Sequence, residues 1–216
     1  MRALPALRDL RVVWGVLAFV ASVGLSACIG PMMGKKVIAE YHGLAGKSVA
    51  IVVYAAPATI DEFPSARTDI SSFLARQMRL KMPDVRLLNY EEVVQWQDKT
   101  INWFAMSEKQ IGRHFGVDRV LYVEVLAYSS RMEAGYGDLQ GYLRANCKIF
   151  ETDTVGDAPA WKALMDVTWP KDRPLSPNQM SEVALRKRTL EVFAEKVIAK
   201  LHDHKEFEKR VSERND

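Results

Sequence analysis

The sequence has no hydrophobic run of the length that a membrane span usually needs. The apolar stretch near its start, residues 12–25, is fourteen residues long, whereas a transmembrane helix needs about 20. Arg2, Arg8 and Arg11 make the start of the chain basic. A basic start followed by a short apolar run is typical of a cleaved secretory signal. We therefore expect residues 1–27 to be a signal peptide.

Without this signal peptide, the rest of the chain has no marked excess of positive or negative charge. The whole chain has 30 basic and 27 acidic residues, and the signal contains three Arg and one Asp, which leaves 27 basic and 26 acidic residues. A nucleic-acid interface needs a clustered basic face, which a net charge of +1 does not suggest. We expect no nucleic-acid partner.

Recognisable catalytic and nucleotide-binding motifs are absent too. No serine lies in the glycine pattern of a nucleophile elbow. The triplet Gly46-Lys47-Ser48 resembles the end of a phosphate-binding loop, but Tyr41 stands where the first glycine should be. The triplet also enters an expected strand, whereas such a loop opens a helix. The sequence therefore predicts a protein that is not an enzyme and that has no cofactor.

Spacing argues against a metal site and a dinucleotide site. His202 and His204 are two residues apart, so on a helix they would point about 200° apart and could not share a metal. Residues 135–141 contain three glycines without dinucleotide-binding spacing, and a turn between two strands explains them. We expect no metal ligands.

Leu25-Ser26-Ala27-Cys28 resembles the lipobox of bacterial lipoproteins. The resemblance implies that the Cys28 sulfur carries a diacylglycerol, that the signal is cut before Cys28, and that the new amino terminus is acylated, commonly with palmitate. An uncleaved anchor and an ordinary signal cut at Ala27 are the alternatives. Gly30 is not the Asp that would resemble an inner-membrane retention signal. We expect a lipid anchor on the periplasmic side of the envelope, with the outer membrane favoured over the inner.

Residues 28–42 are expected to be a short membrane tether. The fourteen residues after Cys28 could span at most roughly 50 Å, so the domain would stay near its bilayer. Lys35 and Lys36 could meet anionic headgroups, although a solvated linker explains them equally simply. If Cys28 carries lipid, Cys147 has no disulfide partner and the protein must be stable without disulfides.

Strands are predicted from two kinds of apolar pattern. Residues 47–55 are apolar on both faces, as in a strand buried inside a sheet. Residues 143–149 and 161–169 alternate apolar and polar side chains, which is typical of antiparallel strands with one wet face. Two further β-rich segments are residues 85–90 and 120–128.

Three helices are predicted from spacing, caps and breakers. The first runs from Thr68, as its cap, to Pro83; the second opens with the capping box Ser107 to Gln110 and stops at Gly116; the third opens with a second capping box at Ser176 to Gln179 and ends near His202. The expected fold class is therefore α/β, a mixed sheet in the order β-α-β-α-β-β-β-α with helices packed on a face. We expect one domain over residues 43–202 and a charged helix end over residues 203–216.

This order, with the phrases GVDRVLYVEV and KIFETDTVGDAPAWKA, resembles the small α/β domain shared by the amino-terminal part of TolB, the curli-secretion lipoprotein CsgG and the lipoprotein activators of peptidoglycan synthases. The resemblance covers most of residues 43–202 and implies a role beside other envelope proteins. Two departures matter. The tether is too short for the reach of a synthase activator, and pore-forming hairpins of the curli type are not evident.

Two features could serve binding. Trp96, Trp103, Phe104 and Met106 are close together in an expected connecting region, where they form either a partner-binding patch or part of the core. Glu124 is the only charge in an apolar strand, and it is either paired or solvated there, or a buried functional carboxylate.

We therefore expect a membrane-anchored, non-enzymatic envelope lipoprotein that binds other proteins in assembly, secretion or transport. Its partners would be the bilayer, through acylated Cys28, and an envelope protein. The first alternative is an auxiliary lipoprotein that holds a small molecule or lipid for a transporter. The second alternative is an envelope hydrolase, which would need convergent polar groups in a pocket.

Overall fold

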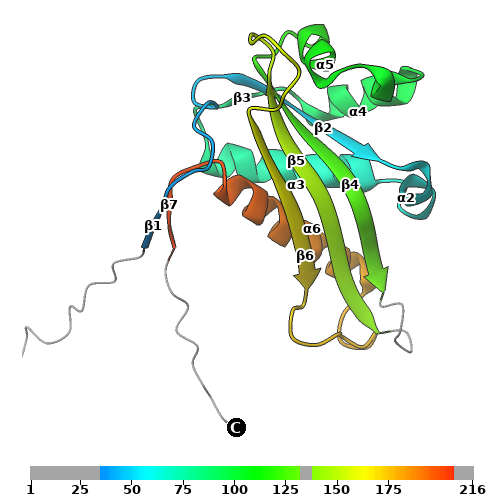
Figure 1. The fold of residues 1–216 in the computed structure, drawn as a ribbon. Helices are drawn as coiled ribbons and strands as arrows, with labels where there is room; N and C mark the ends of the chain where they lie inside the picture. Colours follow the sequence, from blue (N-terminus) through cyan, green and yellow to red (C-terminus); the bar gives the residue numbers. More distant parts are fainter. Residues whose placement is uncertain (1–34, 132–137, 207–216) are drawn as a thin grey trace, which may run out of the picture. The chain divides into compact units, whose positions relative to one another are not determined.

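The computed structural model describes residues 35–131 and 138–206 (Figure 1). Residues 38–204 form one compact unit. A separate two-stranded sheet pairs β1 (Lys35–Val37) with β7 (His204–Glu206). The expected signal peptide and the lipobox lie outside the described residues. No described helix is long and apolar enough to cross a membrane.

The compact unit is built on a five-stranded mixed sheet in the order β3-β2-β4-β5-β6. Its strands are β2 (Ser48–Ala55), β3 (Arg86–Leu87), β4 (Arg119–Arg131), β5 (Leu139–Glu151) and β6 (Trp161–Trp169). Strand β2 is parallel to β3 and β4, whereas β4, β5 and β6 are antiparallel. The α/β fold class with a mixed sheet is confirmed.

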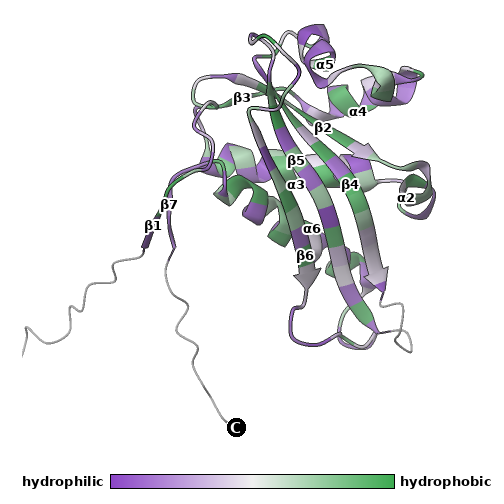
Figure 2. Cartoon of the chain, in the orientation of Figure 1, coloured by the Kyte–Doolittle hydropathy of each residue, from purple (hydrophilic) through white to green (hydrophobic). Residues whose placement is uncertain are grey.

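Two helices pack on one face of this sheet, and the main hydrophobic core lies between them and the strands. They are α3 (Ala66–Lys81) and α6 (Glu182–Ala199), which lie behind the strands in Figure 1. Their inward side chains, such as Leu74 and Phe193, are at most 1% exposed and pack against alternate residues of the strands. Figure 2 shows these hydrophobic residues alternating with hydrophilic ones along β4, β5 and β6.

A second, smaller core lies on the other face of the sheet. It is closed by α4 (Tyr90–Lys99), the 3-10 helix η1 (Trp103–Ala105) and α5 (Glu108–His114). These elements bury Ala50 and Val52 of β2 and Val120 at the start of β4. The helix α2 (Pro57–Glu62) follows β2 directly. The second core therefore belongs mainly to the β2 side of the sheet.

Several local predictions are confirmed by hydrogen bonds and dihedral angles. The side chain of Ser107 accepts from the backbone N–H of Gln110, and the Gln110 side chain accepts from the backbone N–H of Ser107, so the capping box is present. Gly116 has a φ of 62°, the left-handed value expected at a helix end. The sequence therefore predicted correctly where α5 begins and ends.

Other helix boundaries differ from the predictions. Thr68 does not cap α3, which begins at Ala66, and the unpredicted helix α2 lies between β2 and α3. The segment at Ser176 does not open α6: its backbone N–H donates to the Gln179 side chain at 2.9 Å in a separate turn. Ser181 caps α6 instead. A capping-box pattern can close a turn as well as a helix, so it does not fix which one follows.

The ends of the domain also differ from the predictions. Helix α6 ends at Ala199, and residues 204–206 form β7 rather than a helix end. The predicted strand at residues 85–90 is reduced to Arg86–Leu87, because Asn89 caps α4 and Tyr90 begins it. The buried strand β2 is second from the edge of the sheet, and β4 is central.

Gly141 lies inside β5 and not in the predicted turn. A Cβ atom built on it would come within 1.9 Å of the Thr189 hydroxyl oxygen on α6. The glycine therefore allows the helix to approach the strand closely. The other turn glycines predicted there, in residues 135–137, lie outside the described residues.

Candidate functional site

The candidate site is the part of the sheet that no described helix covers. Helices α4 and α5 lie over the β2 side, so the face of β4, β5 and β6 seen in Figure 1 has no described helix in front of it. We call this surface the uncovered face. Its residues are Glu124, Leu126, Tyr142, Arg144, Asn146, Lys148, Lys162, Leu164 and Asp166.

The strand register sets these side chains in rows across the sheet. One such row crosses β2, β4, β5 and β6 and consists of Tyr54, Glu124, Asn146 and Leu164, each of which is the register partner of the next. The apolar members of the uncovered face are partly open to solvent: Leu126 is 48% exposed and Leu164 is 51% exposed. A strand residue that remains apolar and exposed on a face otherwise made of polar groups suits contact with another molecule.

The charges at the centre of the uncovered face are paired with each other. Glu124 accepts hydrogen bonds from the Asn146 amide and from Lys148 Nζ, each at 3.2 Å. Partial burial alone would raise the pKa of Glu124, but these two hydrogen bonds and the Lys148 charge outweigh it and lower the pKa. Glu124 is therefore ionised at neutral pH and is paired, which is the simpler of the two interpretations of this residue.

The Asp166 side chain on β6 contacts two residues of β5. It accepts a hydrogen bond from the Tyr142 hydroxyl at 3.2 Å and lies 3.9 Å from the Arg144 guanidinium. A hollow of about 420 Å³ lies between β5 and β6, where Lys148 and Lys162 line it. Cys147 also lines it, but burial raises the pKa of its thiol to about 12. That thiol stays protonated and is a poor nucleophile.

The predicted aromatic patch is divided between core and surface. Trp103 is 6% exposed and belongs to the second core, and Trp96 and Met106 pack against that core. The Trp96 ring lies 6.3 Å from the Trp103 ring. Phe104 is 58% exposed. Trp103 is thus placed for core packing, whereas Phe104 is available at the surface, and its binding role stays a prediction.

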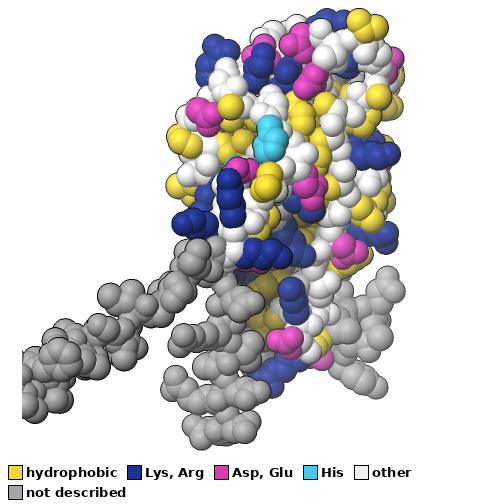
Figure 3. Space-filling view, turned by 60° about the vertical axis from the view of Figure 1, so that its left-hand side comes forward, with side chains coloured by type: hydrophobic (Ala, Val, Ile, Leu, Met, Phe, Trp, Pro, Cys, Tyr) yellow, Lys and Arg dark blue, Asp and Glu magenta, His cyan; other side chains and the backbone are white. Residues whose placement is uncertain are grey.

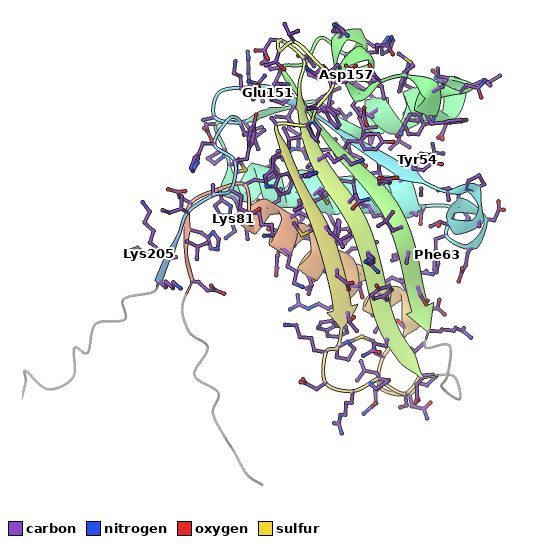
Figure 4. All side chains as sticks on the ribbon, in the orientation of Figure 1. Tyr54, Phe63, Lys81, Glu151, Asp157 and Lys205 are labelled. Carbon is purple, nitrogen blue, oxygen red and sulfur yellow. The ribbon has the colours of Figure 1, made fainter. Side chains whose placement is uncertain are left out.

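Phe104 lies beside the uncovered face. Its ring centroid is 6.5 Å from that of Tyr54, which is labelled in Figure 4 and begins the row that leads to Glu124. Ile101, close by in sequence, is 89% exposed. Sequence analysis did not single out Leu126 and Leu164. With Phe104, these two residues add exposed apolar side chains to the uncovered face and its border.

A buried arginine fastens the segment that precedes β2 to the sheet. The Arg119 guanidinium donates to the Tyr41 hydroxyl at 3.1 Å, to the Gly43 carbonyl at 3.2 Å and to Asp153 at 2.9 Å. Tyr41 in turn donates to Glu151 at 2.6 Å, at the end of β5 labelled in Figure 4. Burial and this hydrogen bond raise the pKa of Tyr41 to about 12. Part of the expected tether is therefore held within the fold.

The residues before Tyr41 are held as well. The backbone N–H of Ala39 donates to Asp203 at 2.9 Å, and that of Glu40 donates to the carbonyl of Lys200 at 2.7 Å. The Glu40 carboxylate accepts from Trp161 Nε1 at 3.0 Å and pairs with Lys200. The folded unit thus begins at residue 38 rather than 43.

The histidine prediction was wrong in its geometry. Because α6 ends before them, His202 and His204 do not lie on one helix, and their ring centroids are only 5.1 Å apart. Each ring Nδ1 is within hydrogen-bond distance of a backbone carbonyl, that of Ile198 for His202 and that of His202 for His204. Within residues 35–131 and 138–206, no group of three or more potential ligands could hold a metal.

Charges of both signs are mixed on the surface that Figure 3 presents, where basic and acidic side chains lie among hydrophobic ones. This face therefore carries no continuous basic patch. The uncovered face also carries charges of both signs, since Glu124 and Asp166 lie among its lysines and its arginine. Such a surface can make specific ion pairs and apolar contacts with a protein of matching pattern.

No protein-family model matches the sequence, and no curated protein matches it. Among solved structures, the PelC dodecamer from Paraburkholderia phytofirmans is 13% identical, with a TM-score of 0.43 over 78% of this chain and 97% of that chain. Lipoprotein GNA1162 from Neisseria meningitidis is 12% identical, with a TM-score of 0.39 over 70% of this chain and 97% of that chain. A minor lipoprotein from Acinetobacter baumannii is 14% identical, with a TM-score of 0.34 over 74% and 98% of the respective chains. Lipoproteins thus recur among the similar structures, but likeness at these identities and TM-scores carries no argument about function.

Proposed function

We propose that this protein is a bacterial envelope lipoprotein that is anchored through acylated Cys28 and faces the periplasm. The sequence Leu25-Ser26-Ala27-Cys28 behind a basic start and a short apolar run supports the anchor. Two or more acyl chains would hold it stably, since each buried methylene contributes about 0.8 kcal/mol. We favour the outer membrane over the inner, because the residue that directly follows Cys28 is not an Asp.

The domain would lie close to that membrane. Because the folded unit begins at residue 38, only nine residues separate it from Cys28. Nine residues reach at most about 30 Å when fully extended, which is shorter than the reach expected for a tether that ends at residue 42. A partner would therefore have to approach the membrane surface.

The function that we propose for the domain is to bind another envelope protein, without catalysis. The observation that carries this proposal is the uncovered face, with Leu126 and Leu164 about half exposed among paired charges. Exposed Phe104 extends it beyond Tyr54. Apolar side chains inside a polar rim are the usual composition of a protein interface.

Replacing Leu126 with Glu should weaken partner binding by about tenfold or more, because a carboxylate without a partner would be buried in the interface. The measurement is quantitative mass spectrometry of proteins that co-purify with the full-length protein from solubilised membranes. Val183→Glu is the matched control, since Val183 is 66% exposed on α6, which packs on the opposite face of the sheet.

A protein that is lost with Leu126→Glu and retained with Val183→Glu supports the proposal. If both variants retain the same co-purifying proteins, the uncovered face does not bind the partner. Loss of a co-purifying lipid or metabolite, with no change in proteins, would favour the alternative of a small-molecule carrier.

A further inference from the structure

The strand β6 leaves a long edge of the sheet unpaired. It has nine residues, and no described strand pairs with its outer edge, whereas the strand at the opposite edge, β3, has only two residues. An edge of this length presents a row of backbone donors and acceptors to any chain that can pair with it. Proteins usually protect such edges, so an open one calls for an occupant.

The order of charges along β6 is complementary to itself. Lys162 precedes the exposed Leu164 by two residues, and Asp166 follows it by two. We infer that β6 is an interface between two copies of this chain, whose β6 strands pair antiparallel about Leu164 and join two five-stranded sheets into one. In this register each Lys162 faces Asp166 of the second copy, and the two Leu164 side chains meet on the twofold axis.

Other antiparallel registers are less favourable. A shift that centres the pair on Lys162 places two lysines opposite each other, and one centred on Asp166 places two carboxylates opposite each other. Like charges directly across a strand pair are destabilising. The intermediate registers set Leu164 opposite a charge. Among these registers, only the one centred on Leu164 places Lys162 of each copy opposite Asp166 of the other copy.

Lys162 lacks such a carboxylate within its own chain. Its register partner on β5 is Lys148, another cation, and Lys148 is itself paired with Glu124. Within the described residues Lys162 has no ion-pair partner. A carboxylate of a second copy would compensate both lysines at once, which gives this edge a preference for an acidic partner strand.

The backbone of β6 has the orientation that this register requires. Lys196 Nζ donates to the Asp166 carbonyl at 3.0 Å, so that carbonyl points away from β5. In an antiparallel strand, residues two apart point their N–H and C=O groups to the same side. Lys162, Leu164 and Asp166 therefore all present these groups to the free edge. Pairing would replace the exposed hydrogen bond from Lys196 to the Asp166 carbonyl with a ladder of backbone hydrogen bonds between the two β6 strands.

This inference does not depend on the partner proposed for the uncovered face. Pairing about Leu164 would place the uncovered faces of the two copies on the same side of one continuous sheet. Leu126 lies two strands away from β6, so Leu126→Glu should leave the pairing intact. Failure of one proposal is therefore distinguishable from failure of the other.

The register is tested by a cysteine on the twofold axis. Paired residues of this type have Cα atoms about 5.5 Å apart, which is within the range for a disulfide. Full-length protein with Leu164→Cys, oxidised in its membrane, should form a covalent dimer in at least about tenfold higher yield than Leu126→Cys. The control has nearly the same exposure and carries the same native cysteines. Equal yields would overturn the inference.

A charge variant separates pairing from folding. Lys162→Glu would place two carboxylates opposite each other at both symmetric positions, while giving Lys148 an acidic neighbour within the chain. We expect the dimer dissociation constant to rise roughly tenfold and the thermal stability of the monomer not to fall. Lys99→Glu, on α4, makes the same change in net charge away from β6. An equal effect of the two variants on the dimer, or none of either, would contradict the register.

Discussion

Cys28→Ser is expected to move the protein from the membrane to the soluble fraction. Serine has no thiol to form the thioether, so no lipid can be attached at residue 28. Once its signal is removed at Ala27, as in an ordinary secreted protein, the variant keeps neither acyl chains nor the apolar run of residues 12–25. The measurement is fractionation of cells that express either protein, with detection in both fractions.

Cys147→Ser is the matched control, since it removes the only other cysteine. Cys147 is fully buried in β5, and its substitution should leave the protein in the membrane. A Cys28→Ser protein that has lost its signal and still remains wholly in the membrane would contradict the lipid anchor. A native protein that retains residues 12–25 would support the alternative of an uncleaved span there.

Arg119→Ala should lower the free energy of unfolding by about 1–3 kcal/mol, because it removes a buried guanidinium and leaves its partly buried hydrogen-bond acceptors without a donor. The Arg119 side chain is 7% exposed and contacts both Glu151 and Asp153. Without it, Tyr41 and the carbonyl of Gly43 also lose a donor. The measurement is chemical denaturation of the folded domain in its soluble Cys28→Ser background.

Arg86→Ala is the control for this change. Arg86 also pairs with a carboxylate, that of Asp118 at 3.6 Å, but its side chain is 72% exposed. Exposed pairs contribute about 1 kcal/mol or less, so the control should have a small effect. If Arg119→Ala costs no more than Arg86→Ala, the segment around Tyr41 is not held by this network, and the shortened tether loses its support.

Periodicity and local chemistry predicted much of the sheet. Alternation in residues 143–149 and 161–169 correctly placed Arg144, Lys148 and Asp166 on a wet face, because a strand turns successive side chains to opposite sides. The buried character of β2 was likewise predicted from its composition.

Tertiary context decided what these patterns could not. A register shift between Val125 and Ala127 turns Tyr128 into the main core, so Tyr128 does not share a face with Glu124 although the two are an even number of residues apart. The exposure of Leu126 depends on how far α4 and α5 extend over the sheet, and no local pattern reports that. The candidate site was therefore only half predictable.

The aromatic cluster shows the same limit. A concentration of Trp and Phe is equally consistent with a core and with a binding patch, because both bury aromatic surface. The structure places Trp103 inside and leaves Phe104 outside. The resemblance to the TolB and CsgG domains remains a prediction from sequence.

The most direct measurement is site-specific photo-cross-linking in intact cells, with a photoreactive residue at position 126 of the otherwise native, lipid-anchored chain. The proposed function predicts one predominant adduct with an envelope protein at position 126 and none at position 183, which is exposed on α6. Adducts of equal yield from both positions, or only lipid adducts from position 126, would contradict it.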